Sequence, residues 1–438
     1  MLVSEMTADV RVPIAPLSLE EAGLNFDLLM QLTLKTLLLT GEQIGYDLAS
    51  RIGLPFPVLA PVFESLKVQR HCEISGGAMV GGPSYKFRIT DAGRERAGLF
   101  LEHNHYIGRA PVPLTQYRRY MDDLRAFAPA RTTRGNVRRA FSHLVVSDRV
   151  LDQLGPAINA GHSMFIYGPP GNGKTVISQA LRNLQEGDVA IPYAIEVEGS
   201  IIQFFDPVYH EERPLPVAGA GLDGGVRHDG RWTRCRRPLV MVGGELTLAQ
   251  LDLRYNPGLG YYRAPIQAAA NGGVLVIDDF GRQACAPRDL LNRWIVPLES
   301  RVDFLTLQTG QKVDFPFTAM VVFATNMNPS ELVDEAFLRR IHYKIYAESP
   351  TVPEFKQIFE RCCRDSGIVF RPEIVDELLT HYYEPRGIQL RGCHPRDLIA
   401  QATSLAEYLG QSVELTPELL ASACSSYFVE DRGAVSSR

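Results

Sequence analysis

The stretch that decides the fold reads "SMFIYGPPGNGKTVISQAL" and runs from Ser163 to Leu181. Its apolar residues Met164–Tyr167 predict a buried strand, and a glycine-rich turn and a helix follow at once. The turn fits G-x-x-x-x-G-K-[ST], a pattern whose backbone N–H groups surround phosphate oxygens. Because strand, loop and helix occur in the required order, we expect a nucleotide-binding loop here.

Each residue type in this loop suits phosphate binding for a physical reason. Glycines let backbone N–H groups curl inward, and the helix N-terminus adds the positive end of its dipole. We expect Lys174 to reach the β- and γ-phosphates of ATP, and the Thr175 hydroxyl to bind Mg²⁺. The expected nucleotide contacts are Gly168, Pro169, Pro170, Gly171, Asn172, Gly173, Lys174, Thr175 and Val176.

A second stretch, "GGVLVIDDFGRQ" from Gly272 to Gln283, places two acids at a strand end. "VLVI" predicts a buried parallel strand, and ligands of open α/β sheets bind at the carboxyl ends of such strands. We therefore expect Asp278 to hold Mg²⁺ through water and Asp279 to polarise the attacking water. Proteins that hydrolyse ATP usually have Glu at this second position. Asp279 is shorter by about 1.5 Å, one carbon–carbon bond, which predicts slow but real hydrolysis.

Three further segments carry polar residues suited to phosphoryl chemistry. The strand in "FTAMVVFATNMNPSEL" ends at Asn326, whose amide is expected to orient the attacking water beside Asp279. Arg339 and Arg340 follow a short helix, so one of them, with Arg340 preferred, is expected to reach the site of a neighbouring subunit. Arg396 begins a later helix and is expected to contact the γ-phosphate.

Composition excludes several classes of protein. The 438 residues carry a net charge of −5, which gives no indication of nucleic-acid binding. No uninterrupted apolar run is long enough to span a membrane, and the acidic, proline-containing N-terminus differs from a signal peptide, so we expect a cytoplasmic protein. The seven cysteines form no CxxC pair, and "HNH" at 103–105 is interpreted as surface, so no metal cluster is predicted.

The N-terminal third is predicted to form a separate small domain. Helical patterns from Phe26, strands at 72–74 and 85–89 and a helix after Thr90 together favour a winged-helix-like unit. The candidate recognition helix, 57–70, begins with two apolar turns containing prolines, whereas helices that read DNA present polar and basic side chains there. Protein docking is therefore favoured over DNA contact.

The expected organisation is an α/β fold with a parallel sheet, a helical lid and this preceding domain. The expected boundaries are an N-terminal tail over 1–24, the winged-helix-like domain over 25–105, a basic linker over 106–140, the nucleotide-binding α/β domain over 141–348 and the helical lid over 349–438. The segment 206–237 is expected to be the least regular part, and 255–265 to pack against the sheet.

Over roughly 141–428, these pieces in this order resemble the AAA+ ATPases. "ESRVDFLTLQTGQKVDFPFTAMVVF" reads as a hairpin turning near Thr309, similar to the pre-sensor-1 hairpin clade of MoxR-like ATPases. The passages "RPLVMVGGELTLAQLDLRYNPG", "IDDFGRQ", "LLNRWIVPLESRVDFLTL" and "VDEAFLRRI" resemble bacterial ATPases with chaperone activity associated with Flp pilus assembly. If this resemblance holds, the Asp-Asp pair is that family's own form of the motif.

The resemblance implies a ring, with a hexamer expected, in which ATP drives remodelling of protein partners in a pilus or secretion context. The hairpin around Thr309 would then face a central channel. Two alternatives stay open: a winged-helix DNA-binding regulator whose assembly ATP controls, and a nucleotide-gated scaffold with little turnover. Nucleic acid is disfavoured as a partner, and ATP and Mg²⁺ are the expected cofactors.

Overall fold

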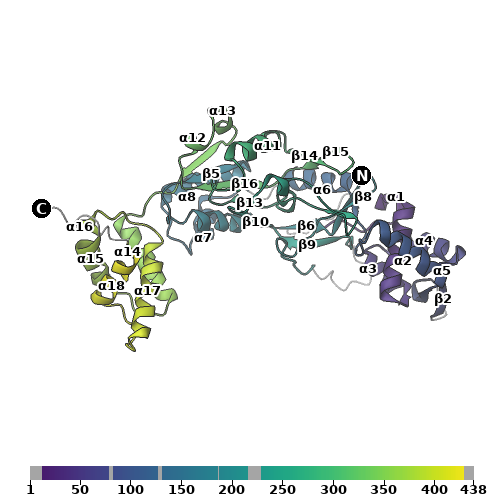
Figure 1. Cartoon of the computed structure of the whole chain (residues 1–438), viewed down its shortest axis with the longest axis horizontal. Helices are drawn as coiled ribbons and strands as arrows, with labels where there is room; N and C mark the ends of the chain where they lie inside the picture. Colours follow the sequence, from purple (N-terminus) through teal and green to yellow (C-terminus); the bar gives the residue numbers. More distant parts are fainter. Residues whose placement is uncertain (1–11, 78–81, 127–130, 186, 216–227, 429–438) are drawn as a thin grey trace. The chain divides into compact units, whose positions relative to one another are not determined.

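The computed structural model describes residues 12–77, 82–126, 131–185, 187–215 and 228–428 (Figure 1). The chain divides into two compact units. Unit 1 comprises Met1–Ala130, Gln185–Leu275 and Gln283–Met320, and unit 2 comprises Arg131–Leu184, Val276–Arg282 and Val321–Arg438. The proposed domain boundaries stay a prediction.

The first part of unit 1 is mainly helical. Its elements are α1 (Leu19–Ala22), α2 (Phe26–Thr40), β1 (Gln43–Ile44), α3 (Gly45–Ile52), α4 (Phe56–Val68), β2 (Cys72–Gly77), β3 (Tyr85–Ile89) and α5 (Asp91–His103). The three strands form a sheet of order β1-β3-β2, and α2 packs against α4 and α5 around a buried core of aliphatic and aromatic side chains. The predicted hairpin and following helix are present, and the winged-helix interpretation stays a prediction.

A second sheet of unit 1 is absent from the sequence-based expectations. Its order is β11-β12-β8-β7-β4, built from β4 (Val112–Pro113), β7 (Ala194–Val197), β8 (Ser200–Gln203), β11 (Arg254–Asn256) and β12 (Tyr261–Arg263). Two antiparallel pairs accompany it: β6 (Asp188–Pro192) with β9 (Trp232–Arg236), and β14 (Val302–Thr306) with β15 (Lys312–Pro316). The hairpin predicted near Thr309 is therefore confirmed.

Four sequence-based expectations in unit 1 differ from the structure. The segment 206–237, expected to be the least regular, contains β9, which packs through Trp232 and Cys235, and its residues 216–227 lie outside the described residues. The tyrosine-rich segment forms strands of the second sheet rather than packing on one. The expected linker contains α6 (Leu114–Ala126), which buries Tyr117. Val12, from the expected tail, is also buried, because burial of aromatic and aliphatic side chains draws these segments into one core; residues 1–11 of that tail lie outside the described residues.

Unit 2 contains the strand and loop that open the sequence analysis. Strand β5 (Met164–Tyr167) pairs in parallel with β16 (Met320–Thr325) and β17 (Tyr343–Tyr346), within a sheet of order β10-β13-β16-β5-β17 that also includes β10 (Leu239–Val242) and β13 (Val274–Ile277). Helices α7 (Arg134–Ala140), α8 (Asp148–Ala160), α9 (Lys174–Ala180), α12 (Pro329–Leu332) and α13 (Glu335–Leu338) accompany these strands. The α/β fold with a parallel sheet is confirmed.

The C-terminal part of unit 2 is a helical bundle with its own core (Figure 1). Its helices are α14 (Val352–Asp365), α15 (Pro372–Leu378), α16 (Glu384–Arg386), α17 (His394–Tyr408) and α18 (Pro417–Tyr427). Phe355 and Phe359 are fully buried in this core. A capping box at Thr351 and Glu354 starts α14, because each side chain satisfies a backbone N–H that the first helical turn leaves unpaired.

The remaining described elements are helical. They are α10 (Ile266–Ala269), α11 (Pro287–Ser300), the 3₁₀ turns Gly82–Ser84, Leu181–Leu184 and Leu248–Leu251, and the π-helical segment Leu379–Tyr383. Among the described residues, no helix is both long and apolar enough to cross a membrane.

Candidate nucleotide-binding site

The site lies at the carboxyl end of β5, where the chain turns into α9. Gly173 is the residue before the helix and has φ +74°, in the left-handed region that L side chains rarely adopt. Gly171 has φ +78°, and an added Cβ there would lie 2.5 Å from the Cys393 sulfur. Glycine at these two positions lets the loop close over the helix N-terminus, as the sequence pattern predicts.

Lys174 is buried, with 7% of its surface exposed. Its amine donates to the carbonyl oxygens of Gly168 at 3.0 Å and Pro169 at 2.8 Å, and to Asn326 Oδ1 at 2.5 Å. Burial lowers the pKa of this amine, while the nearby carboxylates of Asp279 and Asp278 act in the opposite direction. The amine is therefore held by oxygen acceptors on the loop and on the neighbouring strand β16.

Thr175 and Asp278 meet although 103 positions separate them in sequence. The Thr175 hydroxyl donates to Asp278 Oδ2 at 2.8 Å. A hydroxyl and a carboxylate are the hard oxygen donors that Mg²⁺ takes in phosphate sites, where waters and the substrate complete its coordination. Within the described residues, no cluster of three or more His, Cys, Asp or Glu side chains forms a metal site. The pair therefore fits a phosphate-assisted Mg²⁺ site and not an all-protein one.

Asp279 has an unusual backbone conformation and a defined partner. Its φ is +46°, in the left-handed region that is sterically costly for a non-glycine residue. Two hydrogen bonds to β16 hold the next residue, Phe280, in place. Its N–H donates to Ala324 O at 2.7 Å, and its carbonyl oxygen accepts from Thr325 Oγ1 at 2.7 Å. The Asn326 amide donates to Asp279 Oδ1 at 3.1 Å. The anchored chain thus directs this carboxylate toward the end of β16.

The segment that leads into α17 contacts the opposite side of the loop through one backbone and one side-chain group. Cys393 N–H donates to Gly171 O at 2.8 Å, and Arg391 Nη1 donates to Pro170 O at 3.3 Å. The Arg396 guanidinium donates to Asp397 at 2.9 Å, and 73% of the Arg396 side chain is exposed. Arg391 also lowers the pKa of Lys174 as the last of the causes acting on that amine.

These parts enclose a cavity of about 710 Å³. It is lined on the polar side by Lys174, Thr175, Asp278, Asp279 and Asn326. The expected contacts Pro170, Gly171, Asn172, Gly173, Val176 and Arg396 also line it, whereas Gly168 and Pro169 do not. Its apolar lining includes Leu144, Val145, Val146, Ile177 and Ile358. Phosphate-binding groups and an apolar surface suited to a base therefore share one cavity.

The two candidate finger arginines do not line this cavity. Arg339 is exposed and donates to Glu335 Oε1 at 2.8 Å, one helical turn earlier. Arg340 is the second residue after α13 and is partly exposed. Their role toward a neighbouring subunit stays a prediction.

Sequence reasoning missed Arg391 and the apolar lining of the cavity. The signal for the lining was present in "HLVVSD" at 143–148, an apolar run directly before the N-cap of α8. Arg391 lies two residues before Cys393 in "RGCHP", and nothing in that segment alone indicated that it reaches Pro170. Only the packing of the bundle against the loop brings it there.

A family model described as "Domain of unknown function (DUF8689)" matches residues 351–426, which span the helical bundle from the N-cap of α14 into α18. No curated protein matches the chain.

Two solved structures illustrate the structural similarities. The Thermotoga maritima RuvB Holliday junction branch migration motor shares 15% sequence identity, with 66% of this chain and 71% of that chain covered and a TM-score of 0.38. NtrX from Brucella abortus shares 14% identity, with 72% of this chain and 59% of that chain covered and a TM-score of 0.38. Because both TM-scores lie below 0.5, neither likeness carries an argument about this chain.

Proposed function

We propose that this chain is an ATP-hydrolysing motor of the AAA+ type. The observation that carries the proposal is the convergence of Lys174, Thr175, Asp278 and Asn326, from β5–α9, β13 and β16, in one cavity. Parallel strands bring their carboxyl ends to the same edge of a sheet, so residues distant in sequence meet there. The loop would hold the phosphates, and the apolar lining of the cavity would contact the base.

The residues divide between binding and water activation. Lys174 would exchange its loop carbonyl partners for phosphate oxygens, and Thr175 and Asp278 would hold Mg²⁺ directly and through water. Bound Mg²⁺ would supply charge neutralisation at the phosphates. Asn326, which contacts both Lys174 and Asp279, would position the attacking water beside the Asp279 carboxylate.

The short side chain of Asp279 supports slow rather than absent hydrolysis. Its carboxylate is already held by the Asn326 amide, so a small movement of the loop would bring it to a water. We further propose that turnover needs assembly into a ring, in which Arg339 or Arg340 reaches the cavity of the next subunit and Arg396 turns from Asp397 toward the phosphates.

The direct test is phosphate release with ATP and Mg²⁺ over a range of protein concentrations. We expect turnover per chain to rise with concentration, and the substitutions Lys174→Ala and Asp278→Asn to abolish it. Lys67→Ala and Asp365→Asn change the same residue types outside the cavity, at a partly exposed and an exposed position, and serve as matched controls. A wild-type chain that binds ATP but releases no phosphate at any concentration would instead be a nucleotide-gated scaffold.

We propose that the work is done on protein partners, as for MoxR-like chaperone ATPases in pilus or secretion assembly. An Asp279→Asn variant should retain ATP and keep its clients bound. Proteins that the variant enriches with ATP and Lys174→Ala does not enrich would be the clients. Capture of nucleic acid alone would contradict the chaperone function.

The DNA-binding alternative has its own test. The candidate recognition helix α4 buries Val58, Leu59 and Val62 in the core, and Lys67 at its far end pairs with Glu64 at 2.6 Å. A DNA-binding regulator should bind random duplex DNA with an affinity that falls steeply as salt is added. We expect no such binding.

A further inference from the structure

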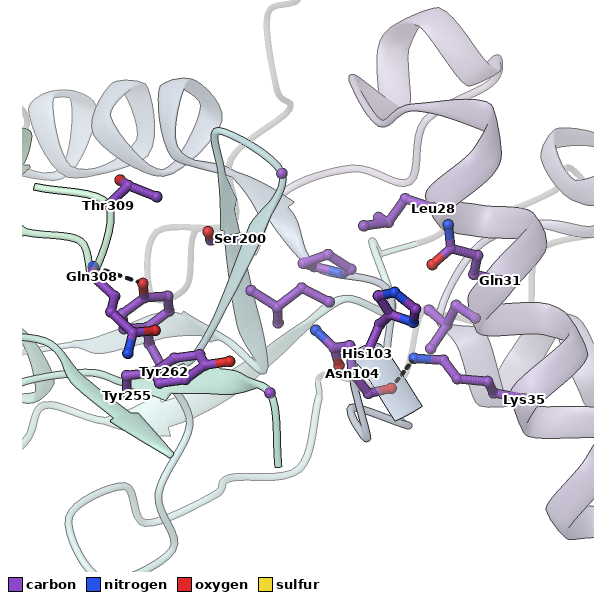
Figure 2. Close-up of a pocket in the computed structure, with 15 residues that line it drawn as sticks. Leu28, Gln31, Lys35, His103, Asn104, Ser200, Tyr255, Tyr262, Gln308 and Thr309 are labelled. Atoms are coloured by element: carbon purple, nitrogen blue, oxygen red, sulfur yellow. Dashed lines mark hydrogen bonds between the residues drawn. The ribbon is translucent and has the colours of Figure 1, made fainter. Parts of the chain in front are cut away.

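Unit 1 contains a cavity of about 450 Å³ that the proposed ATPase site does not use (Figure 2). One wall comes from α2 and the end of α5, and the other from β8, the β11–β12 hairpin and the turn between β14 and β15. Its volume lies in the range of small-molecule sites, and its lining combines aliphatic, tyrosine and polar side chains.

Lys35 is the one buried cation of this lining. It lies in the middle of α2 with 3% of its surface exposed. Its amine donates to Asn104 O, at the C-terminal end of α5, at 2.9 Å (Figure 2). That end of a helix carries partial negative charge, which stabilises the amine in part.

Within the part of the chain that the structure describes, no acidic side chain neutralises the charge of Lys35. Its amine makes no ion pair with the described residues, and the cavity lining contains no carboxylate, the other ionisable lining groups being His103, Tyr255 and Tyr262. Burial alone lowers the pKa of Lys35 to about 8. Burying an ammonium group without a counterion costs free energy. An anion bound in the cavity would therefore offset a cost that the folded chain already carries.

The walls around this amine are held in place by backbone contacts. His105 N–H donates to Leu259 O at 2.8 Å, which joins the segment after α5 to the β11–β12 turn. Gly260 lies so close to this segment that an added Cβ would be 2.3 Å from His103 O. On the far wall, Gln308 N–H donates to the Tyr262 hydroxyl at 2.8 Å (Figure 2). The cavity is therefore preformed, which lowers the cost of binding.

We propose that this cavity binds a small organic carboxylate, with its acidic group at the Lys35 amine and its apolar part against the tyrosine and aliphatic side chains. Leu28, Leu32, Pro111 and Ile201 supply the aliphatic surface, and Gln31 and Ser200 supply polar groups on the two walls. The turn residues Gln308 and Thr309 also line the cavity, so an occupant would contact the β14–β15 hairpin.

The charge of the lining favours a carboxylate over a phosphate. Phosphate carries close to two negative charges near neutral pH and is bound by arginine forks, by several basic groups or by a nest of backbone N–H groups. This cavity has one buried ammonium group and no arginine. A carboxylate, with its single negative charge, therefore matches the single ammonium group of the lining.

The experiment measures binding of benzoate and 4-hydroxyphenylacetate to the full chain by calorimetry and ligand-observed NMR. Benzamide and 4-hydroxyphenylacetamide have the same shapes without the charge, and inorganic phosphate tests the other anion. We expect a carboxylate to bind in the millimolar range or tighter, and about tenfold or more tighter than its amide. Phosphate should bind more weakly than that carboxylate.

The variant Lys35→Met keeps the length of the side chain and removes its charge. It should weaken carboxylate binding about tenfold or more, whereas Lys67→Met, at a partly exposed lysine of α4 outside the cavity lining, should leave it unchanged. Circular dichroism confirms that both variants fold. The proposal is overturned if neither carboxylate binds, if the amides or phosphate bind as tightly, or if Lys35→Met binds as well as the unaltered chain.

Discussion

Two buried lysines, one in each unit, have opposite electrostatic surroundings. Lys174 has three oxygen acceptors and two carboxylates that raise its pKa against the effect of burial. Among the described residues, Lys35 has one carbonyl acceptor and no acidic partner, so burial alone lowers its pKa. A lysine surrounded by oxygens is prepared to exchange them for phosphate, whereas a lysine without a counterion leaves a cavity that favours an anion.

The largest expected effect is on turnover when Lys174 loses its charge. Lys174→Met should lower the rate of phosphate release by roughly 100-fold or more, since an ammonium group facing developing phosphate charge contributes on that scale. Single-turnover assays separate loss of chemistry from loss of ATP affinity. Rates within a few-fold of the unaltered chain would show that Lys174 does not contact the phosphates.

The next effect is on stability, when Lys35 loses its charge. Lys35→Met should raise the free energy of unfolding at pH 7 by about 2 kcal/mol, because a buried and incompletely satisfied charge is replaced by an apolar side chain of similar length. Urea denaturation of both proteins measures the difference. A destabilised variant would mean that the Asn104 carbonyl compensates fully for the buried charge.

The same comparison predicts a dependence on pH. The pKa of Lys35 is about 8 in the folded chain and near 10.5 when unfolded, so the unfolded state binds more protons between these values. The destabilisation of the folded chain by the buried Lys35 charge is therefore complete below pH 8, and it is lost as the pH rises to 10.5. The stability difference between the unaltered chain and Lys35→Met should therefore shrink over this window, measured by urea denaturation at each pH. A constant difference would contradict the assigned cause.

A smaller effect on stability is expected from backbone strain at Asp279, whose carboxylate lies near Lys174. Asp279 has φ +46°, which only glycine adopts without steric cost. Asp279→Gly should therefore be more stable than Asp279→Ala by about 1 kcal/mol, with both variants inactive in phosphate release. Thermal unfolding of the pair measures this difference, which is independent of the lost carboxylate. Equal stability would show that the loop relaxes without strain.

Much of the nucleotide site follows from local patterns. The strand Met164–Tyr167, the helix beginning at Lys174 and the strand ending before Asp278 stand where the sequence predicts them. The contacts that Asn326 makes with Lys174 and Asp279 also follow, because parallel strands place their carboxyl ends together. The roles of Arg339, Arg340 and Arg396 stay predictions, since two of them concern a neighbouring subunit.

The sequence by itself determined where the phosphate-binding loop and the acids at the strand ends lie, because period, glycine placement and loop chemistry act over a few residues. Only the tertiary structure decided that β4, β7, β8, β11 and β12 share a second sheet, that Arg391 reaches the loop, and that Lys35 lies in a cavity without an acid. In sequence, Lys35 is one polar residue of an apolar helix. Whether a counterion stands opposite it depends on side chains up to 274 positions away, such as Thr309, and no local pattern contains that information.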